Sequence, residues 1–181
     1  GNRVEVRANG LSTVSPPALG KLLTASRHPT IGYVKAHSEQ MLDCEWDRHL
    51  FWRENQYVAV LDDIMAKQDG NYEVTVRWQL PGTGVWKGRL LSSLTDNDLT
   101  ACVATAEDRS MPTSVNSLTA GESLLTRNLL FASDGTPATR RDILPVGKRV
   151  AAVSGNDPAI LGLEGYEGHG ISVKAAAFLI S

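Results

Sequence analysis

The sequence has few of the residues that mark disulfide-rich, membrane-spanning or nucleic-acid-binding proteins. Only two of its 181 residues are cysteine, so at most one internal disulfide can form. No apolar run approaches the roughly 20 residues that a membrane helix needs. The 18 lysines and arginines are outnumbered by 20 acidic residues, and no basic patch stands out. These deficits exclude a disulfide scaffold and argue against a membrane or nucleic-acid partner.

The two cysteines lie in different predicted strands. A bridge between Cys44 and Cys102 is geometrically open, but nothing in the sequence favours it. A cysteine without a partner behaves as a small buried hydrophobe. We therefore expect two buried free thiols.

Helical periodicity is scarce, whereas strand alternation is abundant. Between residues 71 and 80, one face holds Tyr72, Val74, Val76, Trp78 and Leu80. The polar residues between them point the other way, because successive side chains of a strand alternate. This pattern predicts a strand with one buried side and one solvent-facing side.

Two further apolar runs precede this strand, at 49–53 and 56–66. The last run is joined to the strand by Gln68-Asp69-Gly70-Asn71, which has the residues of a tight turn. We predict an antiparallel meander of three strands from Arg48 to Leu80, preceded by a strand or strand pair at 32–46.

The rest of the chain repeats short apolar runs separated by turn residues. We predict strands at 2–7, 85–94, 99–105, 124–132, 143–153, 159–163 and 171–180. We read residues 11–30 as a long connection with one helical turn near 18–23, and residues 107–119 as a surface loop. Gly88 is expected to mark a bulge.

This spacing of strands and turns is typical of an all-β protein. We predict an antiparallel two-sheet sandwich with little helix. The length fits a single domain over residues 1–181. The first residue is Gly rather than Met, which indicates either a processed chain or a fragment, and we expect a fragment of a larger protein.

The residues that usually carry chemistry do not form a recognisable set. The four histidines, at 28, 37, 49 and 169, have no metal-binding spacing, and the glycines at 162–170 precede a strand rather than open a helix. We therefore predict no catalytic residue, no metal and no cofactor. His37 is expected to be a half-exposed strand residue that can meet Asp62 or Asp63.

Asp62 and Asp63 are adjacent in a predicted strand, so they point to opposite faces and cannot act as an acid and base pair. A buried carboxylate needs a partner. We expect Arg48, Arg53 or Arg77 to supply it, which makes the carboxylate structural. Metal binding is the alternative role.

The four tryptophans cluster around the predicted meander. Trp78 shares the apolar face of its strand and is expected in the core. Trp46, Trp52 and Trp86 are the candidate carbohydrate-binding residues, because an exposed indole can stack on the apolar face of a sugar ring. Tryptophans at a rim between domains are the other interpretation.

Three stretches together resemble a known family. Arg48-His49-Leu50-Phe51, then 57–62 ending in Asp62, then 70–78 followed by Gln79-Leu80-Pro81, are similar to the C-terminal β-sandwich of heparinase II/III-like polysaccharide lyases. Residues 2–10 resemble the strand and turn that begin His-Asn-Thr in that family. Here Gly1 stands in place of the His, and Arg3 in place of the Thr.

The resemblance implies a non-catalytic part of a larger enzyme. In the family, the catalytic Tyr and His come mainly from an α/α toroid upstream of the sandwich, so no catalytic residue carries over. Asp62 matches the family's strand-ending Asp, which is structural.

The resemblance also implies a location and partners. A uronic-acid-containing polysaccharide, the upstream toroid and a secreted or periplasmic protein are the expectations. In this role the chain braces the toroid and lines a polysaccharide groove. The alternatives are a free-standing carbohydrate-binding module, and an interaction domain that docks through an apolar patch.

Overall fold

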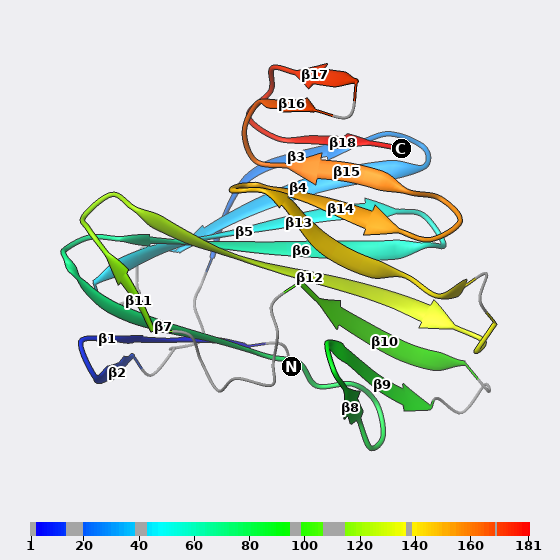
Figure 1. The fold of residues 1–181 in the computed structure, drawn as a ribbon, viewed down its shortest axis with the longest axis horizontal. Coiled ribbons are helices and arrows are strands. Elements are labelled where there is room, and N and C mark those ends of the chain that lie inside the picture. Colours follow the sequence, from blue (N-terminus) through cyan, green and yellow to red (C-terminus); the bar gives the residue numbers. More distant parts are fainter. Residues whose placement is uncertain are drawn as a thin grey trace.

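The computed structural model describes residues 3–13, 20–38, 43–94, 99–106, 115–136, 139–168 and 170–181. These residues form antiparallel strands joined by turns, and none of them is in an α-helix (Figure 1). Within these ranges no helix has the length and apolar character to cross a membrane. The predicted all-β antiparallel sandwich is confirmed.

A central sheet of eight strands organises the fold, in the order β3-β4-β5-β6-β12-β10-β9-β8. Its strands, in chain order, are β3 (Lys21–Arg27), β4 (Ile31–Ser38), β5 (Cys44–Arg53), β6 (Tyr57–Ala66), β8 (Val85–Lys87), β9 (Leu90–Leu94), β10 (Thr100–Thr105) and β12 (Ser123–Ser133). Neighbouring strands are antiparallel throughout.

Two smaller sheets and a hairpin complete the described structure. The N-terminal sheet, in the order β11-β7-β1-β2, contains β1 (Arg3–Ala8), β2 (Leu11–Thr13), β7 (Gly70–Arg77) and β11 (Val115–Leu118). The C-terminal sheet, in the order β13-β14-β15-β18, contains β13 (Asp142–Gly147), β14 (Val150–Ser154), β15 (Ala159–Gly162) and β18 (Phe178–Ile180). A hairpin of β16 (Tyr166–Gly168) and β17 (Ile171–Val173) projects beyond β18 (Figure 1).

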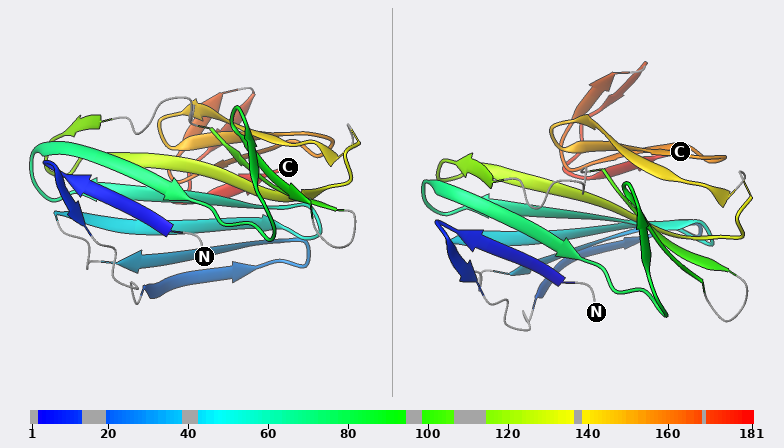
Figure 2. Two further views of the ribbon diagram at one scale, coloured as in Figure 1. Left: turned by 90° about the horizontal axis from the view of Figure 1, so that it is seen from below. Right: turned by 60° about the horizontal axis from the view of Figure 1, so that its bottom comes forward.

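The central sheet is the middle of three layers, with the N-terminal sheet on one face and the C-terminal sheet on the other (Figure 2). Each face has its own apolar core. Val4, Val6, Tyr72 and Ile64 belong to the core under the N-terminal sheet. Phe51, Leu61, Leu129, Ile143 and Leu161 belong to the core under the C-terminal sheet.

Strand β6 shows why the sequence builds this middle layer. It reads Tyr-Val-Ala-Val-Leu-Asp-Asp-Ile-Met-Ala, a nearly continuous apolar run, and such runs are typical of strands buried on both faces. Ala59 and Leu61 enter the core under the C-terminal sheet, while Ile64 and Ala66 enter the other core. A strand covered on one face only would alternate apolar and polar residues instead.

The two cysteines are free and buried, as predicted. Cys44 lies in the core under the N-terminal sheet, and Cys102 lies in the core on the opposite face of the central sheet. Burial raises the pKa of the Cys44 thiol to about 11.

The predicted three-strand meander is wrong in its third strand. β5 and β6 pair in the central sheet, but β7 crosses to the N-terminal sheet and pairs with β1 and β11. Its buried face is as predicted, since Tyr72 and Val76 are 0% and 5% exposed. Alternation identifies which side of a strand is buried, but it carries no information about which strand lies beside it.

The turn before β7 accommodates this change of sheet through Gly70. A Cβ at Gly70 would lie 2.6 Å from the side-chain amide of Asn9, which accepts a hydrogen bond of 2.9 Å from the Asn71 N–H. A residue without a side chain lets the β1–β2 turn approach this closely.

Several predicted segments divide or change in the structure. Residues 85–94, 143–153 and 171–180 each form two strands rather than one. Gly88, with a φ of 59°, makes the hairpin turn between β8 and β9 instead of a bulge. In the predicted connection 11–30, residues 21–27 form edge strand β3 rather than a helical turn, and 18–19 lie outside the described residues. In the predicted loop, 115–118 form β11 and 107–114 lie outside the described residues.

Gly32 in β4 offers a test of the packing across the central sheet. Gly32 is directly opposite Trp52, and a Cβ there would lie 1.9 Å from the indole Cζ2. We expect Gly32→Ala to lower the free energy of unfolding by about 1–3 kcal/mol, because the rigid indole must move. Urea denaturation measures this change.

Gly20→Ala is the matched control, since its Cβ would meet nothing closer than 3.6 Å. It should change the free energy of unfolding by less than about 0.5 kcal/mol. In a Trp52→Leu background, Gly32→Ala should cost less. An equal cost with and without the indole would contradict the proposed clash.

Candidate functional site

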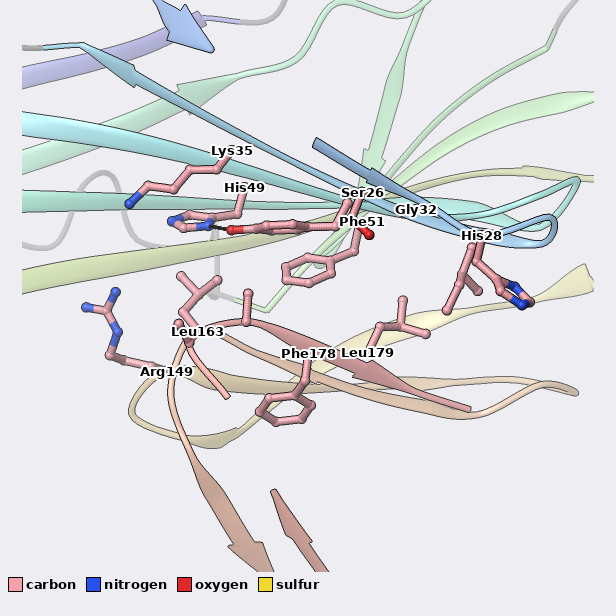
Figure 3. Close-up of a pocket in the computed structure, with 14 residues that line it drawn as sticks. Ser26, His28, Gly32, Lys35, His49, Phe51, Arg149, Leu163, Phe178 and Leu179 are labelled. Atoms are coloured by element: carbon pink, nitrogen blue, oxygen red, sulfur yellow. Dashed lines mark hydrogen bonds between the residues drawn. The ribbon is translucent and has the colours of Figure 1, made fainter. Parts of the chain in front are cut away.

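A pocket of about 630 Å³ lies between the central sheet and the C-terminal sheet (Figure 3). Lys35, His49 and Arg149 gather at one end of it. The remainder is mainly apolar, with Phe51 and Leu163 among its lining residues. A volume of this size, with an apolar body and a few convergent polar groups, is typical of small-molecule sites.

Sheet register places these side chains on one face. Lys35 on β4 is directly opposite His49 on β5, and Tyr33 is opposite Phe51. Because side chains two residues apart point to the same side, all four face the C-terminal sheet. The sequence alternation therefore builds the floor of the pocket.

Arg149 comes from the turn between β13 and β14 and forms the opposite side. The buried Arg127 of β12 fixes this turn by donating hydrogen bonds to the carbonyls of Gly147, at 3.1 Å, and Lys148, at 2.5 Å. Arg149 then reaches the central sheet and binds Asp63 through both terminal nitrogens. It also donates to the hydroxyl of Ser123 at 2.9 Å.

His49 is a buried, neutral imidazole at the polar end of the pocket. It is 4% exposed, and its Nδ1 is hydrogen-bonded to the hydroxyl of Tyr33 at 2.8 Å. Burial, with a smaller contribution from the charge of Lys35, lowers the pKa of His49 to about 4. Burial and the nearby charge of Asp47 raise the pKa of Tyr33 to about 12, so both groups are neutral near pH 7.

Asp47 lies beside His49 and is held by two basic groups. Lys35 Nζ is 2.6 Å from Oδ2, and His37 Nδ1 is 2.5 Å from Oδ1. Burial opposes ionisation of Asp47, but the hydrogen bonds from Lys35 and His37 outweigh it and lower its pKa. The sequence placed His37 near Asp62 or Asp63, whereas the register sets it opposite Asp47.

Asp62 and Asp63 face opposite sides of the central sheet, as predicted. Arg48 binds Asp62 through Nε at 2.7 Å and Nη2 at 3.0 Å, and the indole N–H of Trp46 donates to Oδ1 at 2.8 Å. The expected arginine partner is therefore confirmed for Asp62. The partner of Asp63 is Arg149, which lies 86 residues away in the sequence, and local spacing could not identify it.

The structure does not bring Trp46, Trp52 and Trp86 together. Trp46 and Trp52 are half-buried on β5, while Trp86 is 41% exposed on β8 at the far edge of the central sheet. Five strand spacings separate β5 from β8, which is roughly 24 Å. Trp78 packs against the core under the N-terminal sheet, as expected, and donates to Asn128 at 2.9 Å. Sugar binding by Trp46, Trp52 and Trp86 therefore stays a prediction. The three side chains do not form one shared binding surface.

The residues that do come together were not chosen from the sequence. One ligand atom each from Asp47, His49 and Asp63 lie within 4.8 Å of one another. The only sequence signal is that Asp47 and His49, two residues apart in a strand, share a face. The contribution of Asp63 depends on the alignment of β5 with β6, which sets it directly opposite Asp47.

Comparison with known proteins gives a match in structure only. No family model and no curated protein matches the sequence. The fold is similar to heparan sulfate lyase HepC from Pedobacter heparinus, with a TM-score of 0.59 and 9% identity over 90% of this chain and 30% of that one. It is also similar to a heparinase III structure, with a TM-score of 0.58 and 12% identity over 86% of this chain and 28% of that one. The chain thus has the fold of a part of these lyases and spans less than a third of their length.

The buried His49 predicts a pH dependence of stability. Its pKa is about 4 in the folded protein, against an ordinary value near 6.5 when unfolded. Between these values the unfolded chain binds more protons, so the free energy of unfolding falls as the pH drops. We expect His49→Gln to reduce the loss of stability between pH 7 and pH 5 by about 1–2 kcal/mol.

Urea denaturation at both pH values measures this difference. His28→Gln is the control for replacing an exposed histidine by glutamine. If the His49→Gln protein lost as much stability as the unmodified protein between these pH values, His49 would not be the buried neutral group inferred here.

Proposed function

We propose that the chain is a non-catalytic β-sandwich domain of a heparinase II/III-like polysaccharide lyase. In this proposal it braces an upstream catalytic toroid and lines a polysaccharide groove. The observation that carries the proposal is the match of about 90% of this chain to about 30% of a heparan sulfate lyase chain. A fold shared with only part of such a chain suits a supporting domain rather than a complete enzyme.

An open apolar row on the central sheet supports the bracing role. Trp52, Val58 and Leu130 are directly opposite one another on β5, β6 and β12, on the face that also carries the N-terminal sheet. Val58 is 37% exposed although β6 is an interior strand. Exposed apolar groups on an interior strand suit contact with another domain.

The charges around the pocket support a role in lining the groove. Lys35 and Arg149 line its polar end, and Tyr33 and Phe51 offer ring faces beside them. Cationic groups attract the carboxylates of a uronic-acid polymer, and ring faces can pack against the apolar face of a sugar. Lys35 is paired with Asp47 and Arg149 with Asp63, so an acidic sugar has to compete with these two carboxylates for the cations.

The hydrogen-bonded pair Tyr33 and His49 at the polar end of this pocket is poorly suited to start a lyase reaction. Such a reaction removes a proton next to a carboxylate and requires a base of suitable pKa. Tyr33, with a pKa of about 12, keeps its proton near neutral pH. His49, with a pKa of about 4, is a weak base and is already hydrogen-bonded to Tyr33.

We therefore expect the 181-residue chain to leave heparin, heparan sulfate and polyuronates uncleaved. Each cleavage by a lyase creates an unsaturated uronate, which the ultraviolet absorbance of the reaction detects. A heparinase assayed in parallel is the positive control. Turnover by the purified chain, above that of a mock purification, would refute the non-catalytic role.

Polymer binding tests the groove. We expect Lys35→Met to weaken binding of heparin oligosaccharides by about threefold to tenfold at low salt, since one of the two pocket cations is lost. Lys87→Met, an exposed residue on edge strand β8, is the matched control and should bind as the unmodified chain does. Isothermal titration calorimetry at two salt concentrations measures both.

The exposed Trp86 favours one alternative, a free-standing carbohydrate-binding module. In that case Trp86→Ala would abolish polymer binding, while Lys35→Met would leave it unchanged. This result would contradict the pocket as the binding site and would favour the module.

A further inference from the structure

Three potential metal ligands meet at the polar end of the pocket. Asp47 and Asp63 are directly opposite each other on β5 and β6, and His49 follows Asp47 by two residues on the same face. One oxygen from each carboxylate and one ring nitrogen of His49 lie within 4.8 Å of one another. All three come from the interior strands of the central sheet, which hold them in a fixed register.

We propose that Asp47, His49 and Asp63 bind a divalent transition-metal ion, for which Zn²⁺ is the best fit. One imidazole and two carboxylates are ordinary zinc ligands, at about 2.0–2.2 Å from the ion. Three protein ligands leave a fourth position, and the pocket beside His49 gives it access to water or a ligand. Mg²⁺ and Ca²⁺ prefer all-oxygen ligand sets, so the imidazole selects against them.

The unpartnered nitrogen of His49 is an independent sign of a ligand. His49 is 4% exposed, and its buried Nε2 has no hydrogen-bond partner among the described residues. A buried polar atom without a partner costs free energy, and such atoms call for an explanation. Of the two ring nitrogens, Nε2 is the one not bonded to Tyr33, and it points away from that residue at the polar end of the pocket (Figure 3).

Tyr33 prepares His49 to act as a ligand. A metal-bound histidine usually has its other ring nitrogen in a hydrogen bond, which fixes the ring and its tautomer. The Tyr33 hydroxyl holds Nδ1 at 2.8 Å in this way.

Both carboxylates already form ion pairs with basic side chains, so a metal ion has to compete with these side chains. Asp47 has Lys35 Nζ at 2.6 Å from one oxygen and His37 Nδ1 at 2.5 Å from the other, while Arg149 binds both oxygens of Asp63. Like charges directly opposite each other in a sheet are unfavourable, so some cation is required there. Arg149 is fixed by its own contacts, whereas Lys35 has a flexible side chain that can swing into the open pocket.

Metal binding should therefore draw the ligands together as Lys35 leaves. Zinc–ligand distances near 2.1 Å place the ligand atoms roughly 3.4 Å apart, closer than the present upper limit of 4.8 Å. Asp47 regains an opposite charge from the ion when it loses Lys35. In this exchange Lys35 acts as a competitor of the metal, which separates the proposal from a purely structural ion-pair cluster.

The test is calorimetric titration of the 181-residue chain, dialysed first against a chelator, with Zn²⁺ and separately with Ca²⁺. We expect one Zn²⁺ per chain, a raised Tm in its presence and no comparable response to Ca²⁺. His49→Gln should lower the Zn²⁺ affinity by at least about tenfold, and Lys35→Met should raise it by about tenfold. His28→Gln is the control for surface histidines and should bind as the unmodified chain does.

Each outcome decides the proposal. Absence of Zn²⁺ binding would overturn it. Equal Zn²⁺ affinity of the unmodified chain and the His49→Gln variant would also overturn it, because the metal would then bind at another site. Because His49→Gln can also disturb folding, Lys35→Met provides a second criterion, and lowered affinity in this variant would contradict the competition. Neither titration contains polysaccharide, so the metal site stands or falls independently of the proposed function.

Discussion

Burial of β6 on both faces is the constraint on which the rest of the structure depends. Sheets on either side of the central sheet cover this strand on both faces except at its start, where Val58 is exposed, and its sequence is accordingly almost continuously apolar. Asp62 and Asp63 interrupt it, and alternation sends one carboxylate into each layer. A buried carboxylate must be paired, so each face of the central sheet needs its own arginine.

The ion pairs of Asp62 and Asp63 are formed in different ways, and this difference produces the polar end of the pocket. Asp62 is paired within the central sheet, by Arg48 on the adjacent strand. Asp63 is paired across layers, by Arg149 from the turn before β14. This second pair ties the C-terminal sheet to the central sheet and places a cation opposite Lys35 and His49. The polar end of the pocket thus follows from how one buried charge is neutralised.

The sequence predicts single strands better than it predicts their neighbours. The buried side of β7 follows from alternation, because Tyr72 and Val76 are enclosed as expected. Its sheet does not follow, since pairing with β1 joins residues about 70 positions apart. The candidate site shows the same limit, because Asp63 and Arg149 meet through the layering of two sheets. The tryptophans are conspicuous in the sequence, yet the cluster with an unpartnered buried atom contains none of them.

The stretches that carry the family resemblance contribute to both faces of the central sheet, since His49 and Phe51 from them line the pocket. Arg48, Asp62 and Trp78 make their contacts on the side of the N-terminal sheet, where they act as scaffold. The pocket lies on the other side, where the C-terminal sheet supplies Arg149. A scaffold can keep its shape while the chemistry of a site on it changes. Likeness to lyase structures at 9–12% identity therefore informs the architecture. The ligands of the pocket must be inferred from its own charges and from the unpartnered Nε2 of His49.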